Sequence, residues 1–182
     1  MKTFAVFNEK GGCGKTTTAL AMLSYFASPE LLSAGAGKKA VAIDMDPKQR
    51  SLTFASRVKA QHTIYDVLMD DVSINDAIVD SPFGYIIPGS RDLGRLDAQM
   101  AVSEAETPQQ RQEFIDNLFI LKNKIKELEG FDCVIIDCPP GYENIAMSCM
   151  VAADALIIPA KASMLSLFAL SSLSPNLAQA KE

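Results

Sequence analysis

Short apolar runs alternate with longer amphipathic stretches along this chain. The runs are rich in Val, Ile, Ala and Phe and end at a polar residue or a proline, which is typical of strands buried in a parallel sheet. Strands are predicted at residues 3–8, 40–44, 85–88, 133–137 and 155–159. Helices are predicted between them, at residues 16–27, 49–59, 74–79, 93–103, 108–129 and 144–151, with a last helix from about Met164.

The predicted helix at residues 108–129 has the clearest pattern. Its apolar residues recur three and four positions apart on an otherwise charged helix, which gives one buried stripe. The stripe consists of Phe114, Leu118, Leu121, Ile125 and Leu128. Strands that alternate with such helices form βαβ units, so we expect an α/β fold with three layers, a mostly parallel sheet with helices on both faces. Right-handed crossovers would place ligand-binding residues together at the carboxyl edge of the sheet.

Composition and charge narrow the class of protein. The chain has 182 residues, 48% hydrophobic and 21% charged, which predicts a single globular domain over residues 1–182. The formal net charge of −5 supplies no overall positive field for nucleic acid. No apolar run is long enough to cross a bilayer, and the N-terminus leads directly into a glycine-rich motif, so we expect a cytoplasmic protein without membrane contact. The four cysteines contain no CxxC pair and are expected to be reduced and buried.

The glycine-rich motif KGGCGKTT occupies residues 10–17, between the first predicted strand and the first predicted helix. Its glycines can adopt positive φ angles and have no Cβ, so main-chain amides and the positive end of the helix dipole can hold a polyphosphate. Lys15 would place a cation on the terminal phosphates, and the Thr16 hydroxyl would ligate a bridging Mg²⁺. The general pattern GxxxxGK[ST] requires glycine at the position of Glu9, so the motif is a variant with a second lysine, Lys10. The alternative is a strand-to-helix turn that holds no ligand.

Three aspartates follow predicted strands and would lie at the same edge of the sheet as this motif. Asp44 and Asp46 are two residues apart and would face the same side, while four apolar residues lead to Asp137 in the manner of a Walker B element. A carboxylate there can hold Mg²⁺ through the water shell of the ion. Each aspartate could instead cap a helix or end a turn, and for Asp44 this alternative stays open.

These motifs resemble the ParA and MinD superfamily of ATPases, whose deviant Walker A motif contains both lysines. Six segments are similar, in the same order, to the blocks of ParA-type ATPases: NEKGGCGKTTTA, AIDMDPKQRS, TIYDVLMDDVSINDAI, YIIPGSRDLGRLD, FDCVIIDCPPG and AADALIIPA. The resemblance implies a P-loop nucleoside triphosphatase that binds ATP and Mg²⁺. It also implies a nucleotide-dependent homodimer and a ParB-like partner protein in the partition of a plasmid, chromosome or mobile element.

The resemblance also implies roles for individual residues. Lys10 would reach across a nucleotide-sandwich dimer to the phosphates of the partner, Lys15 would bind the phosphates of its own site, and Asp46 would position the attacking water. The residues implied for Mg²⁺ are Thr16, Asp46 and Asp137. The residues implied for the phosphates are Lys10, Gly11, Gly12, Cys13, Gly14, Lys15, Thr16 and Thr17. A cation supplied in trans can stabilise charge on the transferring phosphoryl group.

Part of the family pattern has no counterpart in this sequence. ParA-type proteins continue well past the strand that corresponds to residues 155–159, with the elements that recognise the base and the basic residues that contact DNA. The base half of the site is therefore largely missing, adenine specificity is implied by the resemblance alone, and DNA contact is left open for this chain. The final residues also lack the basic amphipathic helix of MinD-like membrane binding, and Cys138 and Cys149 do not have the spacing of iron-protein reductases.

The leading hypothesis is a nucleotide-driven switch that dimerises around two ATP molecules and resets by slow hydrolysis. One alternative is a shortened nucleotide-binding or docking module without turnover. Another is a metabolic enzyme of the same superfamily, such as an amidoligase or a phosphotransferase, which would transfer the phosphoryl group to a small molecule.

Overall fold

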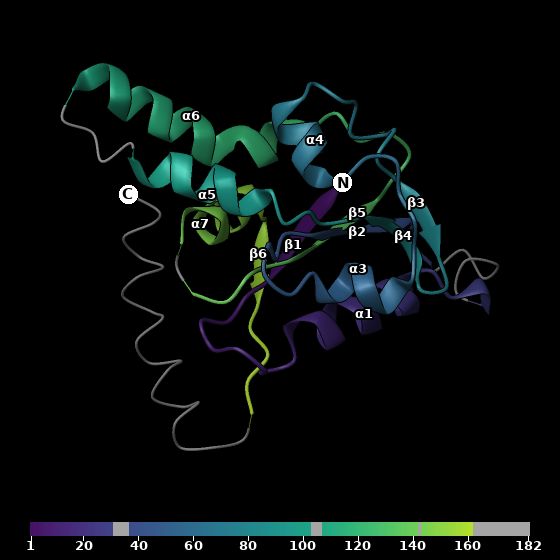
Figure 1. The fold of residues 1–182 in the computed structure, drawn as a ribbon. Helices are drawn as coiled ribbons and strands as arrows, with labels where there is room; N and C mark the ends of the chain where they lie inside the picture. Colours follow the sequence, from purple (N-terminus) through teal and green to yellow (C-terminus); the bar gives the residue numbers. More distant parts are fainter. Residues whose placement is uncertain (31–36, 103–106, 142, 162–182) are drawn as a thin grey trace.

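Residues 1–30, 37–102, 107–141 and 143–161 are described by the computed structural model. They contain a six-stranded sheet in the order β3-β4-β2-β5-β1-β6 (Figure 1). Its strands are β1 (Lys2–Val6), β2 (Ala40–Asp44), β3 (Val79–Ser81), β4 (Gly84–Ile87), β5 (Cys133–Asp137) and β6 (Ala155–Ile157). Neighbouring strands are parallel, with β3 and β4 as the antiparallel exception. The prediction of a mostly parallel sheet is confirmed.

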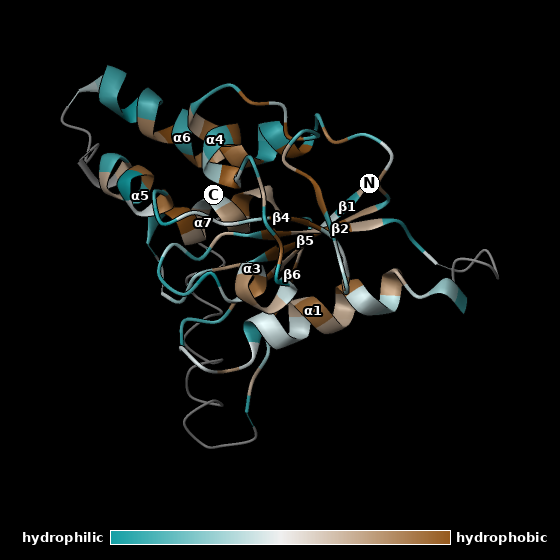
Figure 2. Cartoon of the chain, turned by 45° about the vertical axis from the view of Figure 1, so that its right-hand side comes forward, coloured by the Kyte–Doolittle hydropathy of each residue, from teal (hydrophilic) through white to brown (hydrophobic). Residues whose placement is uncertain are grey.

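Helices cover both faces of the sheet, as predicted. One face carries α1 (Lys15–Phe26) and α3 (Ser51–Ser56) (Figure 1). The other face carries α4 (Ile64–Met69), α5 (Leu93–Val102), α6 (Pro108–Ile125) and α7 (Asn144–Ala152). Because side chains alternate between the two faces of a strand, the sheet contributes to two hydrophobic clusters, one under each helix layer. Figure 2 shows hydrophobic residues concentrated on the central strands.

Strands β2 and β5 are neighbours in the middle of the sheet, and every residue of both is buried. They pair in parallel register, so their last residues, Asp44 and Asp137, lie side by side. The pairing brings two carboxyl groups to one point on the carboxyl edge, where open α/β sheets bind their ligands.

The prediction of a helix at residues 74–79 is wrong. Residues 74–77 form a turn, and residues 79–81 form β3, which returns antiparallel to β4. Ile74 and Ala77 are fully buried. Their spacing of three residues suits one face of a helix, but here a turn brings both side chains into the core.

Two predicted helices are shorter in the structure. The helix predicted at residues 49–59 spans Ser51–Ser56, because Arg50 and Arg57 on either side of it adopt left-handed backbone angles. The helix predicted at residues 108–129 ends at Ile125. The chain continues in a tighter turn with hydrogen bonds between residues three apart, which still buries Leu128.

The short helix α4 is not among the helices predicted from apolar periodicity. It begins at a capping box, in which the side chain of Asp66 accepts hydrogen bonds from the main-chain N–H of Thr63 at 2.6 Å and from its hydroxyl at 2.8 Å. Thr followed three residues later by an acidic residue is a local signal for a helix start. This signal is present here, although the helix that follows has only six residues.

Some predictions lie outside the described residues, and the helix from about Met164 is one of them. That residues 1–182 form a single domain stays a prediction. Cys133, Cys138 and Cys149 are buried, as predicted, whereas Cys13 is half-buried. Among the helices in the described ranges, none has both the length and the apolar character needed to span a membrane.

Candidate functional site

The glycine-rich loop lies at the carboxyl edge of the sheet, between β1 and α1. Gly12 and Gly14 have φ angles of 70° and 97°, in the left-handed region that favours glycine. Gly14 is the N-cap of α1, and no side chain caps this helix end. The first amide groups of α1 therefore keep their capacity to bind an anion, and the helix dipole adds to it.

Lys15 lies at the centre of the loop and is 8% exposed. Its ammonium donates hydrogen bonds to the main-chain oxygens of Asn8 at 3.1 Å and Lys10 at 3.2 Å. These two contacts hold the ammonium against the main chain at the start of the loop, where both acceptors are neutral carbonyl oxygens. A polyphosphate that entered the loop would meet a cation that is already in place.

Thr16 and Asp137 form the second part of the site. The Thr16 hydroxyl donates to Asp137 Oδ2 at 2.7 Å, and Asp137 is almost completely buried. Its other oxygen, Oδ1, is also buried and has no hydrogen-bond partner among the described residues. Burial raises the pKa of Asp137 to about 7, the hydrogen bond from Thr16 opposes the rise, and the nearby charges of Asp44 and Asp46 add to it.

This pair of residues fits a magnesium ion. A buried carboxylate oxygen without a partner is costly unless a cation or water satisfies it, and a hydroxyl lies directly beside it. Oxygen ligands of this kind, few in number and completed by water, are what Mg²⁺ prefers. A bound cation would also favour the charged form of Asp137 over the protonated form.

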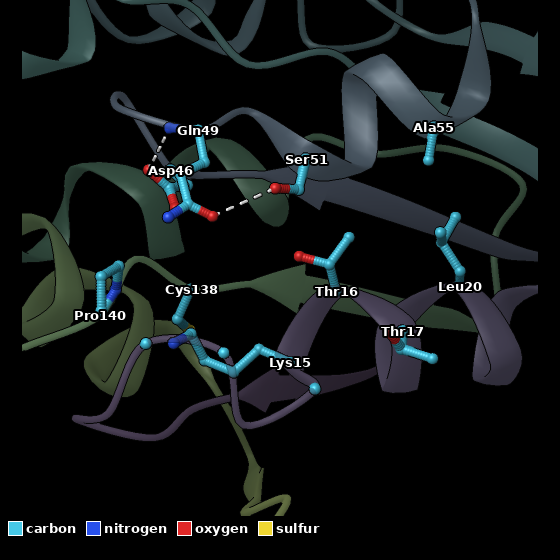
Figure 3. Close-up of a pocket in the computed structure, with 13 residues that line it drawn as sticks. Lys15, Thr16, Thr17, Leu20, Asp46, Gln49, Ser51, Ala55, Cys138 and Pro140 are labelled. Carbon is cyan, nitrogen blue, oxygen red and sulfur yellow. Dashed lines mark hydrogen bonds between the residues drawn. The ribbon is translucent and has the colours of Figure 1, made fainter.

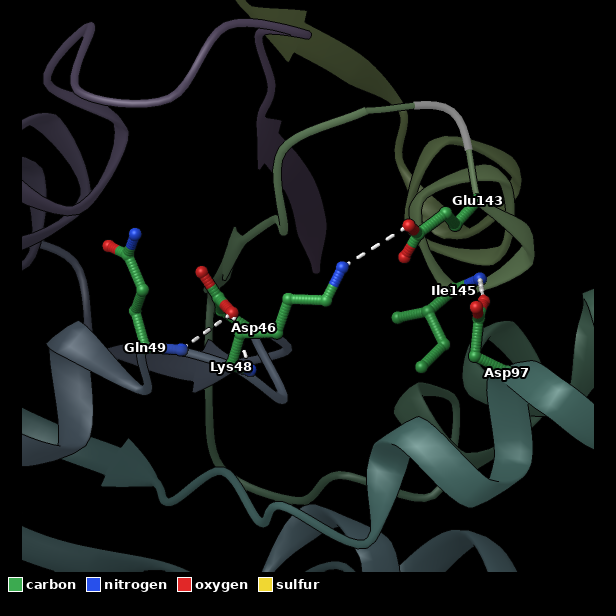
Figure 4. Close-up of polar contacts among 6 residues, drawn as sticks. All are labelled: Asp46, Lys48, Gln49, Asp97, Glu143 and Ile145. Carbon is green, nitrogen blue, oxygen red and sulfur yellow. Dashed lines mark hydrogen bonds and ion pairs between the residues drawn. The ribbon is translucent and has the colours of Figure 1, made fainter.

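Asp46 follows β2 and is held by the turn that it begins. Its Oδ1 accepts hydrogen bonds from the main-chain N–H of Lys48 at 2.8 Å and of Gln49 at 2.9 Å (Figure 4). Asp46 is 7% exposed, and one of its carboxylate oxygens thus receives two donors. The exposed ammonium of Lys48 extends to Glu143 at 3.3 Å, which joins this turn to the segment after β5. The turn fixes the orientation of the carboxylate before any ligand binds.

The Asp44 side chain is surrounded by protein and does not line the cavity next to the glycine-rich loop. It is completely buried, and its two oxygens accept hydrogen bonds from the main-chain N–H of Asp46 and from the N–H and hydroxyl of Thr53. Burial raises the pKa of Asp44, and the hydrogen bonds from Thr53 oppose that rise. These contacts agree with the alternative in which Asp44 organises a turn.

A cavity of about 400 Å³ lies between the loop, the turn after β2 and the segment after β5 (Figure 3). The sequence-predicted residues that line it are Gly11, Gly12, Gly14, Lys15, Thr16, Thr17 and Asp46. Lys10 and Cys13 belong to the loop but do not line the cavity, and Asp137 reaches it through Thr16. Pro140, in the turn that follows the strand ending at Asp137, also lines it, and the lining residues that the sequence did not single out are Leu20, Gln49, Ser51, Ala55 and Cys138.

Gln49 and Ser51 could have been anticipated from their position, because they follow Asp46 in the same turn. No motif points to Leu20 or Ala55, since apolar and small residues on helices carry no chemical signal. They line the cavity because α1 and α3 lie next to each other on one face of the sheet.

A parallel sheet with a glycine-rich loop between β1 and α1, a buried lysine and a strand-end carboxylate defines a P-loop nucleotide-binding protein. The comparison with protein families agrees with this class. A family model described as an AAA domain matches residues 1–182, and the chain belongs to this family, within the ParA and MinD superfamily of P-loop ATPases.

Relatives of known sequence and structure support the same assignment. The chain is 30% identical over 163 residues to the chromosome partitioning protein ParA of Caulobacter vibrioides, which covers 87% of this chain and 55% of that protein. Among solved structures, apo McdA from Cyanothece is 30% identical with a TM-score of 0.76, over 100% of this chain and 66% of that one. Cobyrinic acid a,c-diamide synthase from Mycobacterium smegmatis, solved with ADP and magnesium, is 27% identical with a TM-score of 0.77, over 98% and 67%.

The chain is shorter than these relatives. It spans 62% of an uncharacterised protein from Pseudomonas putida that is 30% identical to it, and about half of the ParA protein.

Proposed function

We propose that this protein binds ATP with Mg²⁺, forms a dimer around two nucleotides and resets by hydrolysis, as a switch in DNA partition. The observation that carries the proposal is the phosphate loop around the Lys15 ammonium, next to a buried oxygen of Asp137 that no described residue hydrogen-bonds. The solved relatives with ADP and magnesium support the choice of ligand, and the identity to a ParA protein supports the role. A role of this kind would place the protein in the cytoplasm.

The residues of the loop and those at the strand ends would have different roles. The amides of residues 11–17 and the Lys15 ammonium would bind the phosphates, because they supply donors and positive charge without rearrangement. Thr16, Asp46 and Asp137 would hold Mg²⁺ directly or through water, and the ion would neutralise charge on the terminal phosphates. Asp46 would orient the attacking water, since its second oxygen is left free of the two main-chain donors that fix the first.

Lys10 would act on the second copy. It is exposed, and it lies at the start of the loop without lining the cavity of its own chain. Its main-chain N–H donates to Asn8 Oδ1 at 2.9 Å, so the backbone is fixed at an exposed residue. An ammonium in this position can reach phosphates across a face-to-face dimer, where it would stabilise the transferring group.

A second candidate function is ATP-dependent amide ligation on a small acid. The fold likeness to cobyrinic acid a,c-diamide synthase, with a TM-score of 0.77, favours this second function. A docking module without turnover is the third. The three functions predict different kinetics, so one set of measurements separates them.

The test is a hydrolysis assay with complementation. Lys10→Ala and Asp46→Ala should each be inactive alone, and a mixture should recover about a quarter of the unmodified rate, because half of the dimers then contain one intact composite site of two. Lys59→Ala, at an exposed lysine away from the cavity, controls for the lost charge.

Each candidate function predicts a different result of these assays. Binding without turnover in the unmodified protein favours the docking module. Turnover that requires both a small carboxylic acid and ammonia or an amine favours the ligase. Hydrolysis that responds to a ParB-like partner and DNA supports the switch. Inactive mixtures with active unmodified protein would exclude Lys10 in trans.

A further inference from the structure

A hydrogen-bonded unit on the buried side of the Asp46 turn has no role in the site described so far. Its centre is Thr53, in the middle of the short helix α3. The Thr53 hydroxyl donates to Asp44 Oδ2 at 2.6 Å, and the Thr53 main-chain N–H donates to the same oxygen at 2.8 Å. The other oxygen of Asp44 accepts from the N–H of Asp46 at 3.2 Å. One buried carboxyl group therefore holds both ends of the turn, at Asp46 and at α3.

The unit also reaches the end of β4. The main-chain N–H of Gly89 donates to the Thr53 hydroxyl at 2.9 Å, so this one oxygen joins α3, β2 and β4. A Cβ on Gly89 would lie 2.8 Å from the main-chain oxygen of Asp44 and 3.0 Å from its Cγ, which leaves no room for a side chain. The Thr53 hydroxyl therefore lies where the chain ends of β2 and β4 approach α3 closely.

The turn that this unit holds carries cavity-lining residues. Asp46 and Gln49 lie in it, and Ser51 begins α3. Neither Asp44 nor Thr53 lines the cavity. The helix spans six residues, Ser51–Ser56, too short to hold its own position, and tertiary contacts must therefore fix it.

We propose that Thr53, through Asp44, is a positioning residue for Asp46, and that its hydroxyl sets the rate of ATP hydrolysis while leaving nucleotide affinity almost unchanged. The inference rests on the proposed function for its kinetic part only. Small displacements of a group that orients a nucleophile lower turnover strongly, whereas phosphate affinity comes from the loop between β1 and α1.

The variants are Thr53→Val, which keeps the shape of the side chain but removes the hydroxyl, and Thr53→Ser, which retains it. Thr63→Val is the matched control, because the Thr63 hydroxyl also bonds a carboxylate, that of Asp66, on the opposite face of the sheet. For Thr53→Val we expect kcat to fall about tenfold with KM changed less than about twofold. Thr53→Ser should restore most of the rate, and Thr63→Val should have the unmodified rate.

A second measurement does not depend on turnover. Trypsin can cut the turn after Lys48 and after Arg50, and the rate at which fragments beginning at Gln49 or Ser51 form reports on local opening. Cleavage there should be about tenfold faster in Thr53→Val than in Thr63→Val under native conditions.

The outcomes separate the two proposals. Equal turnover and equal cleavage in Thr53→Val and Thr63→Val would overturn the positioning role, as would a rise in KM at unchanged kcat. If the unmodified protein does not hydrolyse ATP, the proposed function fails, and the cleavage rates alone decide whether Thr53 positions the turn.

Discussion

Replacing Asp137 with Asn should stabilise the protein in the absence of nucleotide. The pKa of Asp137 rises from 3.8 to about 7 on folding, mainly because its burial disfavours the charged form. The folded state therefore binds more protons than the unfolded state between these two values. The stabilisation from this group is present in full below about pH 4 and is lost as the pH rises to about 7.

The magnitude follows from the same two values. The full rise corresponds to about 4 kcal/mol, of which about 2.5 kcal/mol falls between pH 5 and pH 8. The amide group that replaces the carboxyl group in the variant would carry no charge and could still accept the hydrogen bond from Thr16. The variant should therefore lose this part of the pH dependence, and at pH 8 it should exceed the unmodified protein by up to about 4 kcal/mol in its free energy of unfolding.

Urea denaturation at pH 5 and pH 8, without nucleotide or Mg²⁺, measures the effect. The chain contains no Trp, so far-ultraviolet circular dichroism is the suitable signal. Asp70→Asn, at an exposed aspartate that ends α4, controls for the loss of one negative charge. The same Asp137→Asn variant should gain less stability from ATP with Mg²⁺ than the unmodified protein should gain. Parallel loss of stability in the variant and the unmodified protein between pH 5 and pH 8 would refute the reasoning.

Three further predictions concern single contacts. Gly89→Ala should lower the free energy of unfolding by about 1–3 kcal/mol because its Cβ would lie 2.8 Å from Asp44 O, whereas Gly94→Ala in α5, with 3.9 Å to the nearest atom, should raise it by about 0.5 kcal/mol. Thr107→Ala removes the N-cap of α6, whose side chain accepts from the Gln110 N–H at 3.3 Å, and should cost about 1 kcal/mol in urea denaturation. Thr16→Val leaves both oxygens of Asp137 without a donor from the described part of the chain. Calorimetry should find Mg²⁺-dependent ATP affinity reduced by about tenfold or more, against unchanged affinity if the hydroxyl has no part in ion binding.

The sequence predicts the parts of this fold that depend on local patterning. Residues 133–137 are a continuous apolar run that ends in aspartate, and β5 has the same bounds. The loop at residues 10–17 is equally local, because its glycines, lysines and threonines each have a backbone or chemical reason for their spacing. These features need no knowledge of distant neighbours.

Other features depend on which segments meet in three dimensions. Residues 74–79 have a spacing that suits a helix, but pairing with β4 takes residues 79–81 into a strand. The role of Asp44 also depends on a distant contact, because its partner Thr53 carries no signal in the sequence. A pair of aspartates two residues apart predicts two ligands, and the structure divides them into one that faces the cavity and one that holds the turn.

The most direct test of the central claim is calorimetric titration of the protein with ATP in the presence of Mg²⁺. We expect saturable binding of one nucleotide per chain, weakened when Mg²⁺ is removed, lost in Lys15→Ala and retained in Lys59→Ala. Absence of binding heat from ATP or any other nucleoside triphosphate with Mg²⁺ would contradict the account, as would equal binding by Lys15→Ala.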